Sequence, residues 1–187
     1  MQFEKTVILK DGRTCVLRNA TERDAQAVLD LFLLTHEQTD FLASYPDEST
    51  HTVEGEAAFL KQRTESDREI EILAEVDGKA VGLAGIGCVG PKDKTRHRAE
   101  FGISVDRAYW GLGIGRALTE ACLECAKIAE YAQVELSVVA ENKSAIALYK
   151  SVGFSEYGRN PRGFRSRVSG WQALVEMRLE TDGGQTE

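Results

Sequence analysis

The stretch "YWGLGIGRAL", residues 109–118, places glycine at every second position, at Gly111, Gly113 and Gly115, and follows the last of them with Arg116 and a helix-like sequence. The loss of three side chains in so short a segment indicates either a tight turn that needs glycine backbone angles or a ligand that approaches the main chain closely. A glycine-rich turn that points N–H groups outward at a helix N-terminus forms an anion site. A phosphate, a dinucleotide and a plain turn are therefore the three alternatives.

Two familiar phosphate-binding motifs do not fit this stretch. A Walker A loop has lysine and then serine or threonine after its last glycine, whereas this chain has Arg116 and Ala117. A dinucleotide fingerprint has a third small residue at the spacing GxGxxG and begins directly after a strand. Counted from Gly111, that third position holds Arg116, and "DRAY" separates the glycines from the preceding strand. A P-loop enzyme is excluded, and a nucleotide-binding oxidoreductase is disfavoured.

Outward from the glycines, the pattern predicts strands and helices before them and a regular alternation after them. A strand over 98–105 leads into the stretch, and a helix over 116–130 follows it. The other expected elements are a hairpin around Asp11-Gly12, a helix capped by Thr21 and Asp24, a loop or irregular helix over 35–52, a helix over 53–64, two strands around Asp77-Gly78, a strand over 134–139, a helix over 142–152, and strands over 154–158 and 170–179. This order predicts a mixed sheet with helices on its faces.

The composition is that of one ordinary globular domain, with 42% hydrophobic and 28% charged residues in a chain of 187. A formal charge of -7 argues against nucleic-acid binding, which needs a basic face. No apolar run reaches the roughly 18 residues of a membrane span, and the N-terminal apolar stretch is too short for a signal peptide. We therefore expect a cytosolic protein with a single domain over 1–180, a disordered tail over 181–187, and no nucleic-acid or membrane partner.

The four cysteines predict free thiols, because a chain of this size in a reducing compartment needs no disulfide framework. Cys122 and Cys125 form a CxxC, which raises the question of a zinc or redox site. No second ligand pair stands at metal spacing, and the three histidines are far away in sequence. Leu118, Cys122, Cys125 and Ala129 fall on one helical stripe. We expect the two cysteines to pack in a helix interface and the protein to hold no metal.

A second segment makes the glycine stretch more specific. "AEFGISVDRAYWGLGIGRAL" together with "AENKSAIALYKSVGF" resembles the GNAT superfamily of acetyl-CoA-dependent N-acetyltransferases. The first segment is similar to the family's strand, pyrophosphate loop and helix (Q/R-x-x-G-x-G/A). The second is similar to a later motif in which an asparagine opens a helix, a tyrosine follows seven residues on, and a glycine-aromatic pair closes it. The likeness in the order of strands and helices covers about residues 14–179.

The resemblance implies an α/β (α+β) fold with a mixed, mostly antiparallel central sheet of about six to seven strands and helices on both faces. It implies acetyl-CoA as co-substrate, a small-molecule or peptide amine as acceptor and, since members are often dimers, a homodimer. Where the family often has glutamine or arginine at the first motif position, this chain has Trp110. Backbone N–H groups do most of the phosphate binding in such loops, and Arg116 is either a compensating cation or a solvated helix residue.

The resemblance also implies the cofactor-binding residues. The pantetheine arm of acetyl-CoA would lie along the strand at Ile103, Ser104 and Val105 and pair with main-chain groups. The pyrophosphate would meet the N–H groups from Leu112 to Ala117. Asn142 would either contact the cofactor or cap its helix. The implied cofactor-binding set is Ile103, Ser104, Val105, Trp110, Gly111, Leu112, Gly113, Ile114, Gly115, Arg116, Ala117 and Asn142.

Two residues are implied for catalysis. Tyr149 stands among apolar helix residues and is either core or, by the motif, the group that protonates the departing thiolate. Glu100 is either the general base, acting directly or through water, or the partner of Arg98 or of a neighbouring strand; His97 and Glu141 are weaker candidates for the base. An N–H group near Ser104 would stabilise the oxyanion.

The acceptor amine has two alternatives in the charge pattern. Glu37, Asp40, Asp47 and Glu48 would attract a cationic polyamine or aminoglycoside. Against this, clustered guanidinium groups suit a carboxylate or phosphate, and four arginines fall on the expected connection between the last two strands: Arg159, Arg162, Arg165 and Arg167. We expect an amine that carries an acid group, such as an amino acid, or a peptide N-terminus. A non-catalytic acyl-CoA-binding sensor is the rival class of function.

Overall fold

The computed structural model describes residues 1–181. In this part of the chain the strands and α-helices are β1 (Glu4–Ile8), β2 (Thr14–Asn19), α1 (Ala25–Gln38), α2 (Val53–Glu65), β3 (Ile70–Val76), β4 (Lys79–Cys88), β5 (Arg98–Val105), α3 (Ile114–Ile128), β6 (Gln133–Val139), α4 (Lys143–Ser151), β7 (Ser155–Ser166) and β8 (Gly170–Glu180). Thr181, the first residue of the predicted tail, donates its N–H to the carbonyl of Ala132 at 3.0 Å. The remaining residues of that tail, 182–187, lie outside the described residues.

All eight strands join one sheet in the order β1-β2-β3-β4-β5-β6-β8-β7. Every neighbouring pair is antiparallel except β5 and β6, which run parallel. The mixed, mostly antiparallel sheet expected from the sequence is confirmed. The expected count of six to seven strands is too low, because both arms of the N-terminal hairpin extend the same sheet.

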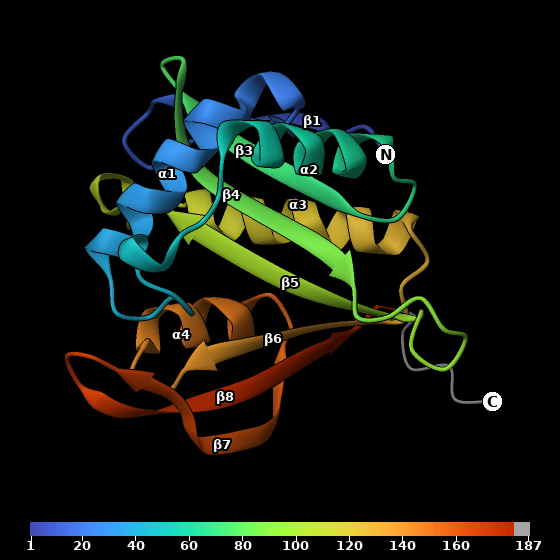
Figure 1. Cartoon of the computed structure of the whole chain (residues 1–187). Helices are drawn as coiled ribbons and strands as arrows, with labels where there is room; N and C mark the ends of the chain where they lie inside the picture. The colour runs from blue at the N-terminus through green and yellow to red at the C-terminus, as the bar shows by residue number, and fades with distance from the viewer. Residues whose placement is uncertain (182–187) are drawn as a thin grey trace.

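Helices cover both faces of the sheet, as expected (Figure 1). On one face α1 and α2 pack over β3 and β4 around a small apolar cluster that includes Val28, Leu31, Leu60 and Leu73. On the other face α3 and α4 bury the larger core. Within the described residues no helix is long and apolar enough to cross a membrane.

The turns and helix starts follow local sequence chemistry. Asp77 and Gly78 adopt φ of 52° and 74° and join β3 to β4, as a two-residue hairpin turn requires. The backbone N–H of Thr21 donates to the Asp24 carboxylate at 2.8 Å just before α1. That helix continues to Gln38, so the predicted irregular segment begins four residues later than expected. Packing against the sheet holds the last turn helical, since Thr35 is buried there.

The two cysteines of the CxxC are fully buried on α3, as the helical stripe predicts. Burial raises the pKa of the Cys125 thiol to about 11, which disfavours the thiolate that zinc or redox chemistry needs. Among residues 1–181 no group of three or more potential metal ligands comes together.

The segment "GRNPRGFRSR" was expected to be a connection, and this expectation is wrong. β7 runs through it to Ser166 and pairs with β8 as far as Gly170. Two register shifts, between Glu156 and Gly158 and between Asn160 and Phe164, absorb the residues that do not fit the ladder. β7 is an edge strand of the sheet, and an edge tolerates Pro161 because one row of its N–H groups needs no partner.

Candidate active site

The parallel strands β5 and β6 pair only at their first residues and then separate. Their register runs from Arg98 opposite Gln133 to Glu100 opposite Glu135, although the strands continue to Val105 and Val139. Figure 1 shows the two strands diverging toward their carboxyl ends. In the described part of the chain, β5 therefore has an open backbone edge beyond Glu100. Such an edge can hydrogen-bond an extended ligand as a strand would.

The glycine loop follows the open end of β5 and begins α3. Gly111 and Gly113 have φ of 77° and 102°, a region that side chains rarely adopt, and a Cβ on either would meet nothing within 4 Å. Gly115 differs, because its Cβ would come 3.4 Å from Leu148 of α4. The first two glycines therefore serve the turn and leave its outer surface bare, whereas the third permits α3 and α4 to pack closely.

The turn leaves a run of backbone donors free. Within residues 1–181, the N–H groups from Leu112 to Arg116 donate to no backbone acceptor outside the helix ladder, and the first turn of a helix has no acceptors to offer them. The N–H of Ala117 instead donates to the Gly113 carbonyl at 3.0 Å, so Ala117 does not belong to the free set. Together with the helix dipole, these donors form an anion-binding surface.

The side chains at the two ends of this loop have partners of their own. The indole N–H of Trp110 donates to the Val105 carbonyl at 2.7 Å, which ties the loop back to β5. Arg116 donates to the Ser151 hydroxyl at 2.7 Å and lies 3.4 Å from Glu120. Arg116 therefore links α3 to α4, and about half of its side chain stays exposed beside the loop.

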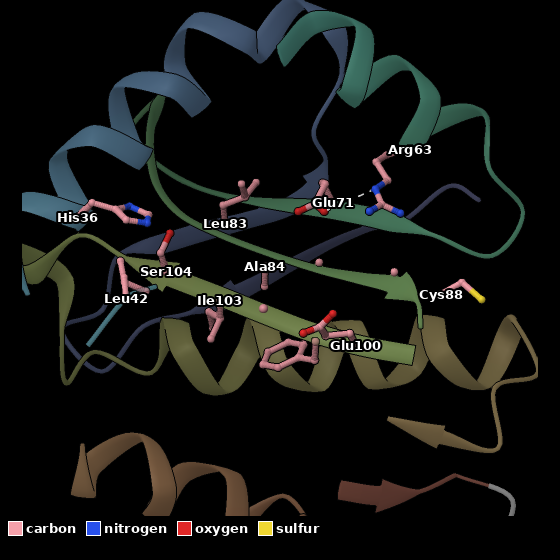
Figure 2. Close-up of a pocket in the computed structure, with 14 residues that line it drawn as sticks. His36, Leu42, Arg63, Glu71, Leu83, Ala84, Cys88, Glu100, Ile103 and Ser104 are labelled. Atoms are coloured by element: carbon pink, nitrogen blue, oxygen red, sulfur yellow. Dashed lines mark ion pairs between the residues drawn. The ribbon is translucent and has the colours of Figure 1, made fainter. Parts of the chain in front are cut away.

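A cavity of about 420 Å³ lies on the α1 and α2 side of the sheet, over β4 and β5. Burial alternates along this part of β5: Ala99 and Phe101 are buried, whereas Glu100 and Gly102 are exposed. The lining includes His36 of α1, Arg63 of α2, and Glu100, Ile103 and Ser104 of β5, as Figure 2 shows. Burial lowers the pKa of His36, so this imidazole is neutral at pH 7.

Glu100 lines this cavity and is exposed. The alternative expectation, an ion pair with Arg98, is wrong. Arg98 pairs with Glu135 of β6 through both Nε and Nη2. Glu100 is thus left on the cavity surface of β5. His97 and Glu141 are exposed and do not line the cavity.

Tyr149 lies on the opposite face of β5 and is only 7% exposed. Its ring meets Phe101 edge-on, with 6.1 Å between centroids, and lies 5.9 Å from Phe154. Within residues 1–181 its hydroxyl makes no hydrogen bond, and burial raises its pKa to about 12. Tyr149 is therefore both a core residue and a proton-bearing donor with its hydrogen-bonding capacity unused.

Asn142 caps α4, which is one of the two roles that the sequence suggested for it. Its side-chain oxygen accepts from the N–H of Ala145 at 3.2 Å and from the hydroxyl of Ser144 at the same distance. The capping oxygen holds the start of α4, the helix that carries Tyr149.

The acidic loop after α1 and the basic hairpin β7-β8 bind each other. Arg167 forms ion pairs with Asp47 at 2.7 Å and Glu48 at 3.1 Å. Asp40 accepts hydrogen bonds from the hydroxyls of Ser166, Ser169 and Tyr45. Asp47, Glu48 and Arg167, which the sequence suggested as binding residues for two different classes of substrate, are therefore paired with each other. Arg162 and Arg165 instead flank the ring of the exposed Trp171, at 5.4 and 5.5 Å.

This combination of a splayed parallel strand pair, a bare glycine turn and a tyrosine helix agrees with the comparison of the sequence with known families. A sequence model of the acetyltransferase (GNAT) family matches residues 31–154. The match covers the greater part of the chain and includes β5, the glycine turn and α4. The chain belongs to the acetyltransferase (GNAT) family.

Several GNAT relatives carry named activities. N-alpha-acetyltransferase RimI of Mycobacterium tuberculosis is 39% identical over 109 residues, which are 58% of this chain and 65% of that protein. L-amino acid N-acetyltransferase AaaT of Escherichia coli is 30% identical over 149 residues, 76% of this chain and 84% of that protein. An uncharacterised N-acetyltransferase of Methanocaldococcus jannaschii is 30% identical over 88% of this chain and 67% of its own length. The chain thus spans about two thirds of the mycobacterial and archaeal relatives.

Solved GNAT structures share the fold. A GNAT-family acetyltransferase of Streptococcus pneumoniae superposes with a TM-score of 0.85 at 26% identity, covering 89% of this chain and 99% of the other. A phosphinothricin acetyltransferase of Sinorhizobium meliloti, solved in complex with AcCoA, superposes with a TM-score of 0.80 at 18% identity, covering 92% of each chain.

Sequence reasoning missed one titratable group in this GNAT site, Glu71 of β3. Its carboxylate lines the cavity beside Arg63, whose Nε lies 3.8 Å away. A Cβ on Gly85 would come within 2.3 Å of the carboxylate oxygens, so only glycine leaves room for them. The signal was present in the strand "IEILAEV", where a glutamate stands among residues that are otherwise mostly apolar.

Burial raises the pKa of Glu71 from 4.5 to about 7, with Arg63 opposing the shift and Glu56 and Glu69 adding to it. The folded state then binds more protons than the unfolded state between pH 4.5 and 7, so stability falls as the pH rises through this window. The loss is at most about 3 kcal/mol. Glu71→Gln is expected to unfold at a higher temperature than the wild type at pH 8.5 and at a similar one at pH 4.5, measured by scanning calorimetry. The exposed Glu65→Gln serves as the control, and equal pH dependence in all three proteins would contradict the assignment.

Proposed function

We propose that this GNAT protein transfers an acetyl group from acetyl-CoA to a primary amine by direct attack in a ternary complex. The observation that carries the proposal is the junction of the open β5 edge with the glycine turn. An extended arm and a pyrophosphate, the two parts of coenzyme A nearest its thioester, need these two surfaces side by side. The cavity on the α1 and α2 side of the sheet gives the amine a separate approach to β5.

The cofactor is proposed to bind through backbone groups. The pantetheine arm lies along Ile103, Ser104 and Val105, although the carbonyl of Val105 already accepts from Trp110. The pyrophosphate meets the free N–H groups of the turn from Leu112 to Arg116. Gly111 keeps the approach bare. The bound AcCoA in the structurally similar phosphinothricin acetyltransferase supports this class of ligand.

The reaction needs proton transfer at two places, away from the acceptor amine and onto the leaving thiolate. Glu100 is proposed as the base that receives the proton of the bound ammonium, directly or through water, because it lies on β5 at the cavity surface. The neutral amine attacks the thioester carbonyl, and an N–H near Ser104 stabilises the oxyanion. The C–S bond then breaks, and Tyr149 donates its hydroxyl proton to the leaving thiolate. The nitrogen releases its second proton to solvent as the amide forms, and solvent reprotonates Tyr149.

Magnitudes favour an α-amino acceptor. An alkylammonium with a pKa near ~10.4 costs about 4 to 5 kcal/mol to deprotonate at pH 7, whereas an α-ammonium with a pKa near ~8 costs about 1 to 2 kcal/mol. The names of two relatives, an N-alpha-acetyltransferase and an L-amino acid N-acetyltransferase, support the same choice. We propose an amino acid or a peptide N-terminus as acceptor. Polyamines and aminoglycosides are disfavoured because Asp40, Asp47 and Glu48 are occupied within the chain.

One preparation tests the function. Calorimetric titration is expected to show acetyl-CoA binding, and a free-thiol assay is expected to show release that depends on added amino acid or peptide. Strong preference for polyamines would contradict the proposed acceptor. Binding without release over the whole panel would favour the acyl-CoA sensor instead. Light scattering on the same sample tests the expected homodimer, and cell fractionation tests the expected cytosolic location.

A further inference from the structure

Three residues on neighbouring strands form a row across the cavity floor. Glu71 of β3 stands opposite Gly85 of β4, and Gly85 stands opposite Gly102 of β5. Residues paired in this way point to the same face of a sheet. The Glu71 carboxylate lies directly over Gly85, and the space above Gly102 is open, since a Cβ there would meet nothing within 4 Å. A carboxylate thus faces the open edge strand across bare backbone.

A second row lies beside the first, at Gly87 of β4 and Glu100 of β5. The Arg63 guanidinium covers Gly87, since a Cβ there would come 3.0 Å from Nη2. Figure 2 shows Arg63 and Glu71 together at one side of the cavity, with Glu100 on β5. Neighbouring strands lie about 4.8 Å apart. The Glu71 carboxylate is therefore about one strand spacing from the space over Gly102 and about two from the open edge of β5.

Several charged or titratable groups surround this carboxylate. Arg63 and Glu56 approach from α2, and Glu69 from the residue before β3. His36 of α1, Cys88 of β4 and Glu100 of β5 line the same cavity. Arg63 is shared, because its Nη1 lies 2.6 Å from Glu69. Arg63 therefore compensates the negative charge of Glu71 only in part, and the neighbouring carboxylates of Glu56 and Glu69 add to that negative charge.

We propose that Glu71 stores the proton that the acceptor amine loses, receiving it through water held over the bare backbone of Gly85 and Gly102. The inference rests on the proposed function and adds a residue to it. Glu100, one strand nearer the open edge, is still the first base: it takes the proton of the ammonium, directly or through water, and passes that proton on through water to Glu71. The distance of about two strand spacings from the β5 edge suits a relay of one or two waters and excludes direct contact.

The proton balance is complete within this scheme. The ammonium gives one proton to Glu100, directly or through water, and water carries that proton on to the Glu71 carboxylate. The amine nitrogen then forms its bond to the acetyl carbon. The C–S bond breaks, and the thiolate takes its proton from Tyr149. The second proton of the nitrogen leaves through the same water to solvent. Tyr149 regains its hydroxyl proton from solvent. Glu71 releases its proton to solvent when the product departs.

The burial of Glu71 gives it a property that solvent-exposed carboxylates generally lack. A proton acceptor works best when its pKa is near the working pH, and burial brings the pKa of Glu71 to about 7. A carboxylate that lowers the stability of the fold when ionised, and that requires glycine at position 85, calls for a compensating role. The open space over Gly102 connects the Glu71 carboxylate to the reacting centre.

The test compares three variants by the pH dependence of kcat and kcat/KM with acetyl-CoA and the best acceptor. The wild type should lose kcat as the pH falls below about 7. Glu71→Gln should lower kcat at pH 7.5 on the order of 10²-fold and abolish that acidic limb, with acetyl-CoA Kd unchanged within twofold. Glu71→Asp should restore part of kcat. Glu69→Gln removes a neighbouring negative charge, so it should move the limb to lower pH with little change in maximal kcat.

The outcomes separate the two proposals. Glu100→Gln should lower kcat and raise the KM of the amine but keep the acidic limb that Glu71 sets. Loss of the acidic limb in this variant but not in Glu71→Gln would overturn the role of Glu71. So would a Glu71 carboxyl that, followed by ¹³C NMR in the folded wild type, completes its titration below pH 5. Wild-type protein that releases no thiol with any amine would overturn both this role and the proposed function. The NMR titration uses the wild type, so it does not depend on a variant that folds.

Discussion

Gly113→Asp is expected to raise the Kd for acetyl-CoA on the order of 10³-fold. A carboxylate at this position would stand among the free N–H groups of the turn, where the pyrophosphate is proposed to bind. Two like charges about 4 Å apart near a protein surface repel by about 4 kcal/mol, and the carboxylate would also take up donors that the phosphates need. Calorimetric titration measures the effect directly, without any need for turnover.

The matched control is Gly113→Asn, which has nearly the same shape and no charge. Both side chains meet the same backbone strain, because Gly113 has φ of 102° as the residue before α3. Asparagine is among the residues that tolerate positive φ best. We expect Gly113→Asn to weaken binding by about tenfold or less and to lower Tm as much as Gly113→Asp does. Equal loss of binding in the two variants would show that the turn, and not the charge, was responsible.

Tyr149→Phe is expected to lower kcat about 10²-fold and to leave acetyl-CoA binding unchanged. General acid catalysis by one positioned group contributes at least this much. The substitution keeps the ring that contacts Phe101 and Phe154, and the hydroxyl that it removes has no partner within residues 1–181. Unfolding temperature should therefore not fall. Because burial raises the pKa of Tyr149 to about 12, we expect the hydroxyl to stay protonated over the assay range and to give no basic limb below pH 10.

Tyr157→Phe is the control for this variant, because Tyr157 is an exposed tyrosine of β7. Steady-state thiol release gives kcat and KM, and calorimetry gives Kd. An unchanged kcat in Tyr149→Phe would mean that solvent protonates the thiolate. A parallel loss of binding and Tm would assign Tyr149 to the core alone.

Local patterns predicted most of the fold because they act over short distances. The Asp77-Gly78 turn, the helix over 53–64 and the burial of Cys122 and Cys125 each follow from a few neighbouring residues. The spacing of glycines likewise predicted the bare turn before α3. The extent of β7 was missed, because proline and charge in "GRNPRGFRSR" are typical of a loop. Pairing with β8 overrides that preference, and the edge position tolerates it.

The cavity depends on pairings between distant residues, which no local pattern contains. Glu71, Gly85 and Gly102 are separated by 14 and 17 positions and meet only through strand register. Arg167 pairs with Asp47, which is 120 residues away in the sequence. These two charges are therefore not available to bind a substrate.

The sequence by itself determined the family, the class of fold, the glycine turn and the helix that carries Tyr149, since each is written in contiguous residues. Only the tertiary structure decided which charges remain available in the cavity. A side chain's burial and pKa depend on what the rest of the chain brings against it, as Arg63 and bare glycines are brought against Glu71.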